Sequence, residues 1–286
     1  MPSRMNDPAE SWELPWSQSE DAGYSRGICD VFPSVPRRAE DLPRGALDAL
    51  IECCGLEGLH QVFMIPRSAR PTGVGDQKVI SPRSVLGIGT RAVGLWTEEP
   101  VPGSKVAIPL ERISAIEDVT ILLYGRLSFI SPSERLTIRY NTLARSGLKS
   151  ALLELRQRLA GPPEALPPQD PGVPELPVKW KWLLRSPLLA FHENAPVTWC
   201  FAHAMRASRQ DVDRGQILVV NPHELVYMCD PPEASHTYGA DSFIVPRPRI
   251  TRVRDRETYL EVASNGARLS LAMVTELRKA GARWFS

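Results

Sequence analysis

Two stretches of the chain, residues 84–96 and 216–228, carry the same sequence pattern. The first reads Ser84-Val-Leu-Gly-Ile-Gly-Thr-Arg-Ala-Val-Gly-Leu-Trp96, and the second reads Gln216-Ile-Leu-Val-Val-Asn-Pro-His-Glu-Leu-Val-Tyr-Met228. Each stretch holds two apolar runs separated by a short polar turn, which is typical of two antiparallel strands. We therefore predict that one β-rich unit occurs twice in the chain.

The repeat continues downstream in the same order. Ile108-Pro-Leu-Glu-Arg-Ile113 corresponds to Val245-Pro-Arg-Pro-Arg-Ile250, and Arg135-Leu-Thr-Ile138 corresponds to Arg268-Leu-Ser-Leu271. Asn265-Gly266 predicts a tight turn just before the last of these segments, since both residues tolerate positive φ angles. Each unit is expected to end in a helix, over residues 147–159 and about 273–284.

Residues 1–40 form an acidic tail without sustained periodicity. They carry seven acidic and four basic side chains, and such a segment is expected to be disordered or loosely docked. Trp12 and Trp16 are the exception, because a free tail would leave both apolar rings in water. We expect these two side chains to pack either on the chain's own surface or on a partner.

A proline-rich spacer separates the two units. Residues 161–178 hold seven prolines and three acidic residues but no basic one, and proline favours an extended, semi-rigid conformation. The predicted domains are therefore residues 41–160 and 179–286. The first carries 15 basic and 12 acidic side chains and the second 15 and 11, so both would weakly attract an anionic partner.

A family resemblance follows from these segments. Several antiparallel strands closed by one helix, with residues 108–116 as a mid-domain strand and 245–250 as its counterpart, resemble a bacterial pleckstrin-homology-like (PH-like) domain. The resemblance implies an α+β, mainly β fold of two tandem PH-like domains. Each would be an antiparallel, strongly bent sheet or partly open barrel closed by a C-terminal helix. Such domains generally bind proteins or acidic lipid headgroups, which implies a non-enzymatic interaction or adaptor module.

Arginine pairs in the loop after the first strand of each copy form one candidate binding site. They are Arg67 and Arg70 in the first copy and Arg206 and Arg209 in the second. The loop resembles the headgroup-binding loop of PH-like domains, and paired arginines with hydroxyl neighbours could hold a phosphate. The alternative is a solvated loop without a ligand.

A second candidate site belongs to the second copy alone. On a strand, Arg252, Arg254 and Arg256 would project from one face. This positive stripe could meet a phosphate or an acidic protein surface, or it could keep an edge strand from pairing with other chains. Only Tyr259 lies near enough to stack on a base, which argues against nucleic acid.

The sequence motifs that could indicate a phosphate-binding loop or a metal site give little support for either. The glycines of Gly87-Ile-Gly89-Thr-Arg-Ala-Val-Gly94 lead into a strand, with no helix N-terminus for a phosphate. Cys200 and His203 are three residues apart on a predicted strand, so they point to opposite faces. We expect no enzymatic activity, no cofactor and no metal, with an enzyme whose site lies between the domains as the alternative.

The compartment follows from composition. The five cysteines are odd in number and lack the spacing of a disulfide framework. The chain has no apolar run of about 18 residues, and its first 40 residues lack the apolar core of a secretory signal. We expect a cytoplasmic protein without a transmembrane segment that binds a protein partner through exposed strand edges. Peripheral binding to anionic lipid at the inner membrane face is the alternative.

Overall fold

A computed structural model of the chain is mainly β in the part that it describes. It describes residues 34–55, 58–71, 78–98, 104–121, 124–142, 146–161, 199–204, 215–230, 239–273 and 275–285. Sixteen strands and few helices occur in these ranges, which confirms the predicted α+β, mainly β class. Trp12, Trp16 and linker residues 162–178 lie outside the described residues.

The chain divides into two units, Met1–Ala107 and Ile108–Ser286. The division falls inside the strand β6 (Ser104–Pro109). It therefore lies within the range 41–160 that the sequence assigns to the first domain, and the two units do not follow the two sequence repeats.

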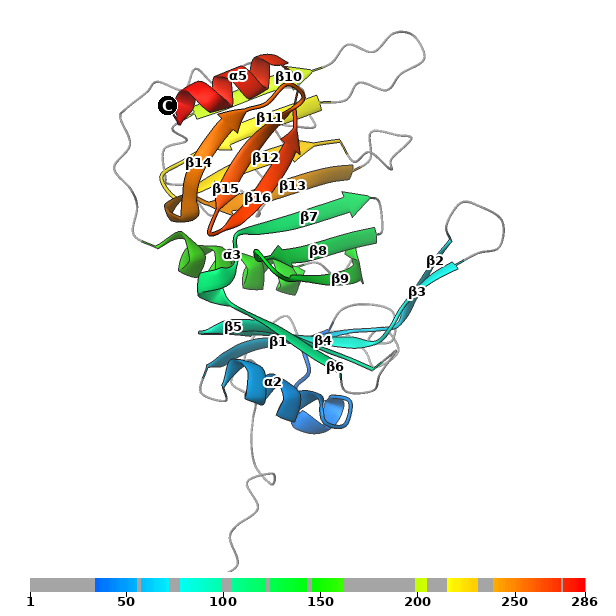
Figure 1. Ribbon diagram of the computed structural model, residues 1–286. Coiled ribbons are helices and arrows are strands. Elements are labelled where there is room, and N and C mark those ends of the chain that lie inside the picture. Colours follow the sequence, from blue (N-terminus) through cyan, green and yellow to red (C-terminus); the bar gives the residue numbers. More distant parts are fainter. Residues whose placement is uncertain are drawn as a thin grey trace, which may run out of the picture. The chain divides into compact units, whose positions relative to one another are not determined.

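The first unit is a four-stranded sheet with one helix packed on it (Figure 1). Its strands, in spatial order, are β1 (Leu59–Ile65), β4 (Ser84–Gly89), β5 (Ala92–Thr97) and β6. The remaining elements are the 3-10 turn η1 (Ala39–Asp41), the helix α2 (Ala46–Cys54) and the hairpin of β2 (Ser68–Pro71) and β3 (Lys78–Ser81).

Glycines in the sheet let α2 pack closely. Ala46, Leu50 and Cys54 recur every four residues and are buried, so they share the face of α2 that meets β4 and β5. A Cβ at Gly94 would lie 3.1 Å from the Cys54 sulfur, and one at Gly89 would lie 2.9 Å from the Cys54 Cβ. Helix packing thus accounts for glycine at these positions of the Gly87–Gly94 stretch.

The second unit contains a large sheet, a small sheet and two helices (Figure 1). The large sheet holds, in spatial order, β10 (Trp199–Ala204), β11 (Gly215–Val220), β12 (Glu224–Cys229), β13 (Gly239–Pro246), β7 (Ala115–Ile121), β8 (Tyr124–Ile130) and β9 (Arg135–Asn141). The small sheet holds β14 (Ile250–Asp255), β15 (Tyr259–Ser264) and β16 (Ala267–Ala272). The helical elements are η2 (Leu110–Arg112), α3 (Ser146–Ala160), η5 (Arg247–Arg249) and α5 (Thr275–Trp284).

The matched sequences form the same elements in the same order. β6 ends at Pro109 and passes through η2 toward β7, and β13 ends at Pro246 and passes through η5 into β14. In both repeats a four-stranded arrangement precedes the 3-10 turn, and three antiparallel strands and a helix follow it. The first repeat differs by its added helix α2 and the hairpin β2–β3.

One strand pair joins elements of the two repeats into a continuous sheet. β7 of the first repeat pairs antiparallel with β13 of the second, with Glu117 opposite Phe243 and Asp118 opposite Ser242. β7, β8 and β9 therefore extend the four strands of the second repeat into a seven-stranded sheet.

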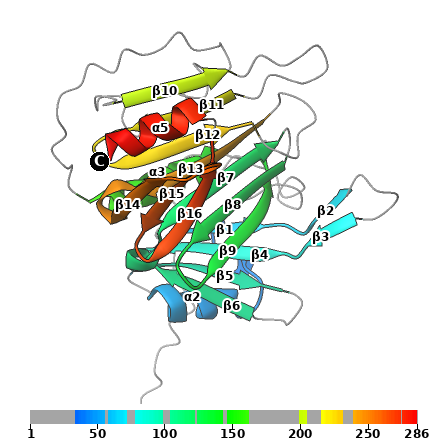
Figure 2. The same ribbon diagram turned by 45° about the horizontal axis from the view of Figure 1, so that its top comes forward.

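The core of the second unit lies between its two sheets and is closed by α5 (Figures 1 and 2). Leu218 of β11 packs with Leu260 of β15, Leu271 of β16 and Leu277 of α5 in one buried cluster. A Cβ at Gly281 would lie 2.8 Å from a methyl group of Leu218, so glycine allows α5 to approach the sheet.

The tight turn predicted at Asn265-Gly266 is confirmed. The φ angles are 46° and 83°, and the two residues connect β15 to β16. The Asn265 amide donates a hydrogen bond to the Glu111 carbonyl, and the Ser264 hydroxyl donates one to the Ser114 carbonyl at 2.8 Å. These bonds fasten this end of the small sheet to the residues that connect η2 to β7.

Candidate interaction surfaces

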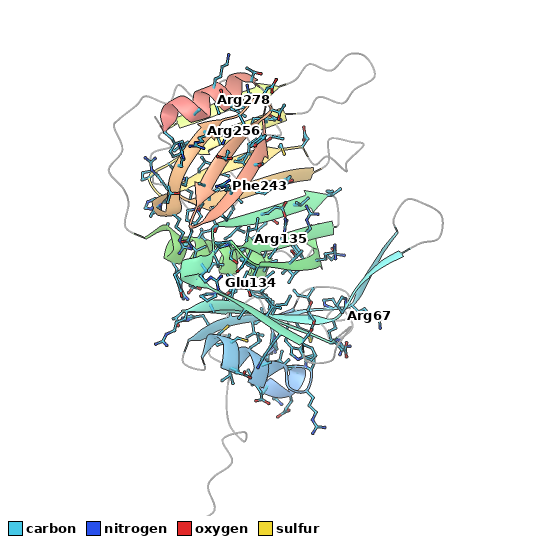
Figure 3. The ribbon with its side chains drawn as sticks, in the orientation of Figure 1. Arg67, Glu134, Arg135, Phe243, Arg256 and Arg278 are labelled. Carbon is cyan, nitrogen blue, oxygen red and sulfur yellow. The ribbon has the colours of Figure 1, made fainter. Side chains whose placement is uncertain are left out.

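The loop arginines are placed only in part. Arg67 follows β1 at the base of the β2–β3 hairpin and is exposed (Figure 3). Arg70 lies in β2. Arg206 and Arg209 lie outside the described residues, so the pairing of the two loops stays a prediction.

Arg252 and Arg254 lie in β14 and Arg256 directly follows it, and Arg254 and Arg256 share a carboxylate. An Arg256 Nη2 lies 3.2 Å from Oε1 of Glu261 on β15, and the Arg254 Nη1 lies 4.0 Å from the same oxygen. Arg254 and Arg256 therefore project from one face, as the period of a strand predicts. Arg252 is exposed on the same strand, and β14 is an edge of the small sheet.

Neighbouring arginines of the same sequence cluster have structural partners. Arg249 of η5 donates hydrogen bonds to the carbonyls of Leu110 and Ile113, and burial lowers the pKa of its guanidinium. The Arg247 guanidinium lies 5.8 Å from the centre of the Phe285 ring. These contacts distinguish Arg247 and Arg249 from Arg252, Arg254 and Arg256, whose charge lies on the small sheet.

A fourth arginine on this face, Arg268 of β16, was not among the sequence candidates. Val262 and Leu269 point into the core, so by alternation their neighbours Ala263 and Arg268 point outward. Strand pairing places Arg252 opposite Ala263 and Ala263 opposite Arg268. The closeness of Arg268 to the other arginines depends on the register of three paired strands. The spacing of residues along a single strand therefore does not predict it.

We call this outward side of the small sheet the arginine face. It consists of Arg252, Arg254, Arg256, Glu261, Ala263, Arg268 and Ser270. Four arginines stand against one glutamate, which leaves a formal charge of plus three. Arg252 and Arg268 are exposed, and neither forms an ion pair with any residue that the structure describes.

The corresponding side of the first repeat is arranged differently. Glu117 of β7 is buried and forms ion pairs with Arg126 of β8, at 3.5 Å, and with Arg135 of β9. Arg135 occupies the position of Arg268, and Glu117 occupies the position of Arg254. Arginine replaces this glutamate in the second repeat, so among the described residues Arg268 lacks the ion pair that Arg135 forms.

The outer edge of β6 is a second exposed surface. β6 is the last strand of the order β1-β4-β5-β6, so its other edge pairs with no described strand. Val106 is 44% exposed, and it is the one large apolar side chain in the described part of the chain that counts as exposed. Lys105 beside it is exposed and forms an ion pair with Glu52 of α2.

Tyr140 and Asp118 are buried polar side chains that pair with each other. The Tyr140 hydroxyl donates a 2.9 Å hydrogen bond to the buried Asp118 carboxylate. Burial raises the pKa of the Cys54 thiol to about 12 and also raises the pKa of Tyr227. A thiol with so high a pKa is a poor nucleophile near neutral pH, because little thiolate is present.

Comparisons with known proteins leave the family open. No protein-family model, no curated protein and no solved structure matches the chain. Among the described residues, no group of three or more His, Cys, Asp or Glu is placed to hold a metal ion. No helix in the described ranges has the length and apolar character needed to cross a membrane.

Proposed function

We propose that the protein is a non-enzymatic protein-interaction module that accepts a strand from a partner along the outer edge of β6. One observation carries the proposal. β13 is the counterpart of β6 in the second repeat, and its corresponding edge is occupied by β7. The corresponding edge of β6 pairs with no strand among the described residues.

The correspondence assigns a register to the added strand. Because Pro109 matches Pro246, Lys105 takes the place of Ser242 and Val106 takes the place of Phe243. The residues of β7 opposite these two positions of β13 are Asp118 and Glu117. By this analogy, the partner strand runs antiparallel to β6.

The exposed side chains of β6 favour a particular partner. Lys105 forms an ion pair with Glu52 of α2. An acidic residue opposite Lys105 in the partner strand would share its ammonium group, whereas a basic residue would meet a like charge. Val106 offers apolar area to a cross-strand neighbour, and main-chain hydrogen bonds supply the remaining affinity, as is usual in strand addition. The preferred partner is an extended segment that alternates apolar residues with an acidic one.

PH-like architecture is part of the same proposal. It is supported by the order of elements in the second repeat, where four strands, three strands and a C-terminal helix surround one buried cluster. In the first repeat, the three later strands join β13. The outer edge of β6 pairs with no described strand, so the proposed architecture includes the edge on which the proposed activity depends.

Site-specific photo-crosslinking tests this proposal. The full chain is expressed in cells of its source with a benzophenone amino acid at position 106, and a matched chain carries the group at Ala272, which is exposed on the edge strand β16. We expect a discrete crosslinked protein from position 106 and not from 272. The crosslinked segment should be extended and contain an acidic residue.

A charge reversal serves as the control for specificity. Adding Lys105→Glu to the chain with the crosslinker should lower the yield about tenfold, since an acidic strand would meet a like charge. Equal yields from positions 106 and 272, or a yield that Lys105→Glu leaves unchanged, would mean that β6 is not the binding edge.

A further inference from the structure

We propose that Arg252 and Arg268 form a clamp for a phosphate monoester on a phosphorylated segment of a protein partner. This site lies on the second unit and does not depend on strand addition at β6. It differs from the loop arginines in position, and it adds Arg268, whose place is set by strand register.

The clamp spans three strands. Arg252 of β14 and Arg268 of β16 flank Ala263 of β15 in one row across the sheet. Neighbouring strands are about 4.8 Å apart, so the two arginines leave the sheet about 10 Å from each other. Ala263 adds only a methyl group between them, which leaves space above it where two long side chains can converge on one group.

The charge of the clamp is uncompensated within the described residues. The acidic side chain of the arginine face, Glu261, lies near Arg254 and Arg256. Asp255 at the end of β14 forms an ion pair with Arg278 of α5. Arg252 and Arg268 are thus free to bind an external anion.

A phosphate monoester fits this arrangement better than a single carboxylate. Near neutral pH it carries a charge of about −1.5 to −2 and presents three acceptor oxygens, whereas a carboxylate carries one charge and two oxygens. Two guanidinium groups from opposite sides can each donate paired hydrogen bonds to different oxygens. The Ser270 hydroxyl, exposed two residues after Arg268, adds a neutral donor on the same face.

The arginine face lacks large exposed apolar side chains among its described residues, which favours a protein partner over a membrane. Peripheral proteins commonly add apolar side chains that enter the lipid to their charge attraction. The exposed large apolar residue among the described residues is Val106, on β6 and not on the arginine face. The face offers charge and small side chains, which suits a phosphorylated polypeptide lying across the sheet.

Peptide retention on the immobilised full chain tests the clamp. The probes are a degenerate peptide pool with one central phosphoserine, and matched pools with serine or glutamate at that position. We expect selective retention of the phosphoserine pool, weakening as salt rises. The double variant Arg252→Ala with Arg268→Ala should lower retention of the phosphoserine pool about tenfold. Lysine at both positions should restore only part of this retention, because lysine lacks the planar guanidinium fork of arginine.

Two control variants distinguish binding at the clamp from binding to other exposed arginines and from binding at β6. Arg44→Ala with Arg91→Ala removes two exposed arginines of the first unit and should leave retention unchanged. Val106→Lys should also leave retention of the phosphoserine pool unchanged, because β6 is not part of the clamp. Failure of the clamp can therefore be distinguished from failure of strand addition at β6. The clamp is overturned if the double alanine variant retains the pool normally, if the glutamate pool binds equally, or if no pool is retained. Binding to phosphatidylserine vesicles in place of the phosphopeptides would also overturn it.

Discussion

Arg156 of α3 donates two hydrogen bonds to Glu224 of β12, although the two residues are 68 positions apart in the sequence. Nε lies 2.8 Å from Oε1, and Nη2 lies 2.5 Å from Oε2. Both side chains are almost fully buried, at 1% and 2% exposed. The pair connects the closing helix of the first repeat to the sheet of the second, within one unit.

Breaking this pair should destabilise the second unit strongly. Glu224→Gln leaves the Arg156 charge buried without its counter-charge, and removal of one partner of a buried pair typically costs about 3–5 kcal/mol. Urea unfolding of the full chain, monitored by circular dichroism, measures the free energy of unfolding. Glu154→Gln on the same helix is the control, because the Glu154–Arg158 pair is partly exposed and should contribute less than about 0.5 kcal/mol. Equal effects of the two substitutions would contradict the arrangement of α3.

Close packing of α2 on its sheet predicts the effect of enlarging a glycine. Gly94→Ala places a methyl group 3.1 Å from the Cys54 sulfur and 3.2 Å from a Leu50 methyl group, so overpacking should cost about 1–3 kcal/mol. Combining it with Cys54→Ala removes one of the crowded atoms, and the two substitutions should then cost less than their sum. Additive costs in a thermal or urea unfolding series would show that α2 does not rest on Gly94.

Cys54 should make stability fall in alkaline solution. Its folded pKa of about 12 lies above the ordinary value of 9.0, so the folded chain keeps a proton that the unfolded chain has lost. The stabilisation is complete below pH 9 and is lost as pH rises toward 12, by up to about 1.4 kcal/mol per pH unit. The stability difference between the native chain and Cys54→Ala should therefore narrow with rising pH, and a constant difference would contradict this burial.

The local sequence pattern was sufficient to predict many of the strands, the helix after β9 and the α+β, mainly β fold class. Alternating and continuous apolar runs identified the strands on either side of residues 90 and 222, and Asn265-Gly266 identified its turn. The helix expected at 147–159 is observed as Ser146–Ala160. Each of these signals arises within about fifteen neighbouring residues, where propensity and period act directly.

Pairing between distant strands was not predictable in the same way. Nothing in Glu117 or Phe243 specifies that they lie opposite each other, because apolar faces suit many sheet neighbours and the sequence separation is large. Arg254 and Arg256 of the candidate stripe reach one carboxylate, and a binding role for the stripe stays a prediction. Arg268 was missed, since its closeness to Arg252 depends on register across β15.

If β6 offers the same kind of edge as β13, a strand that pairs with β13 should also bind β6, and amide hydrogen exchange can detect this binding. The probe is a synthetic peptide with the sequence of residues 113–121, which contains the strand that pairs with β13. Added to the full chain, it should slow exchange of the backbone amides of residues 104–109, and Val106→Lys should remove the protection. A scrambled peptide of the same composition should have no effect. Unchanged exchange across residues 104–109 at saturating peptide, or equal protection by the scrambled peptide, would contradict the claim.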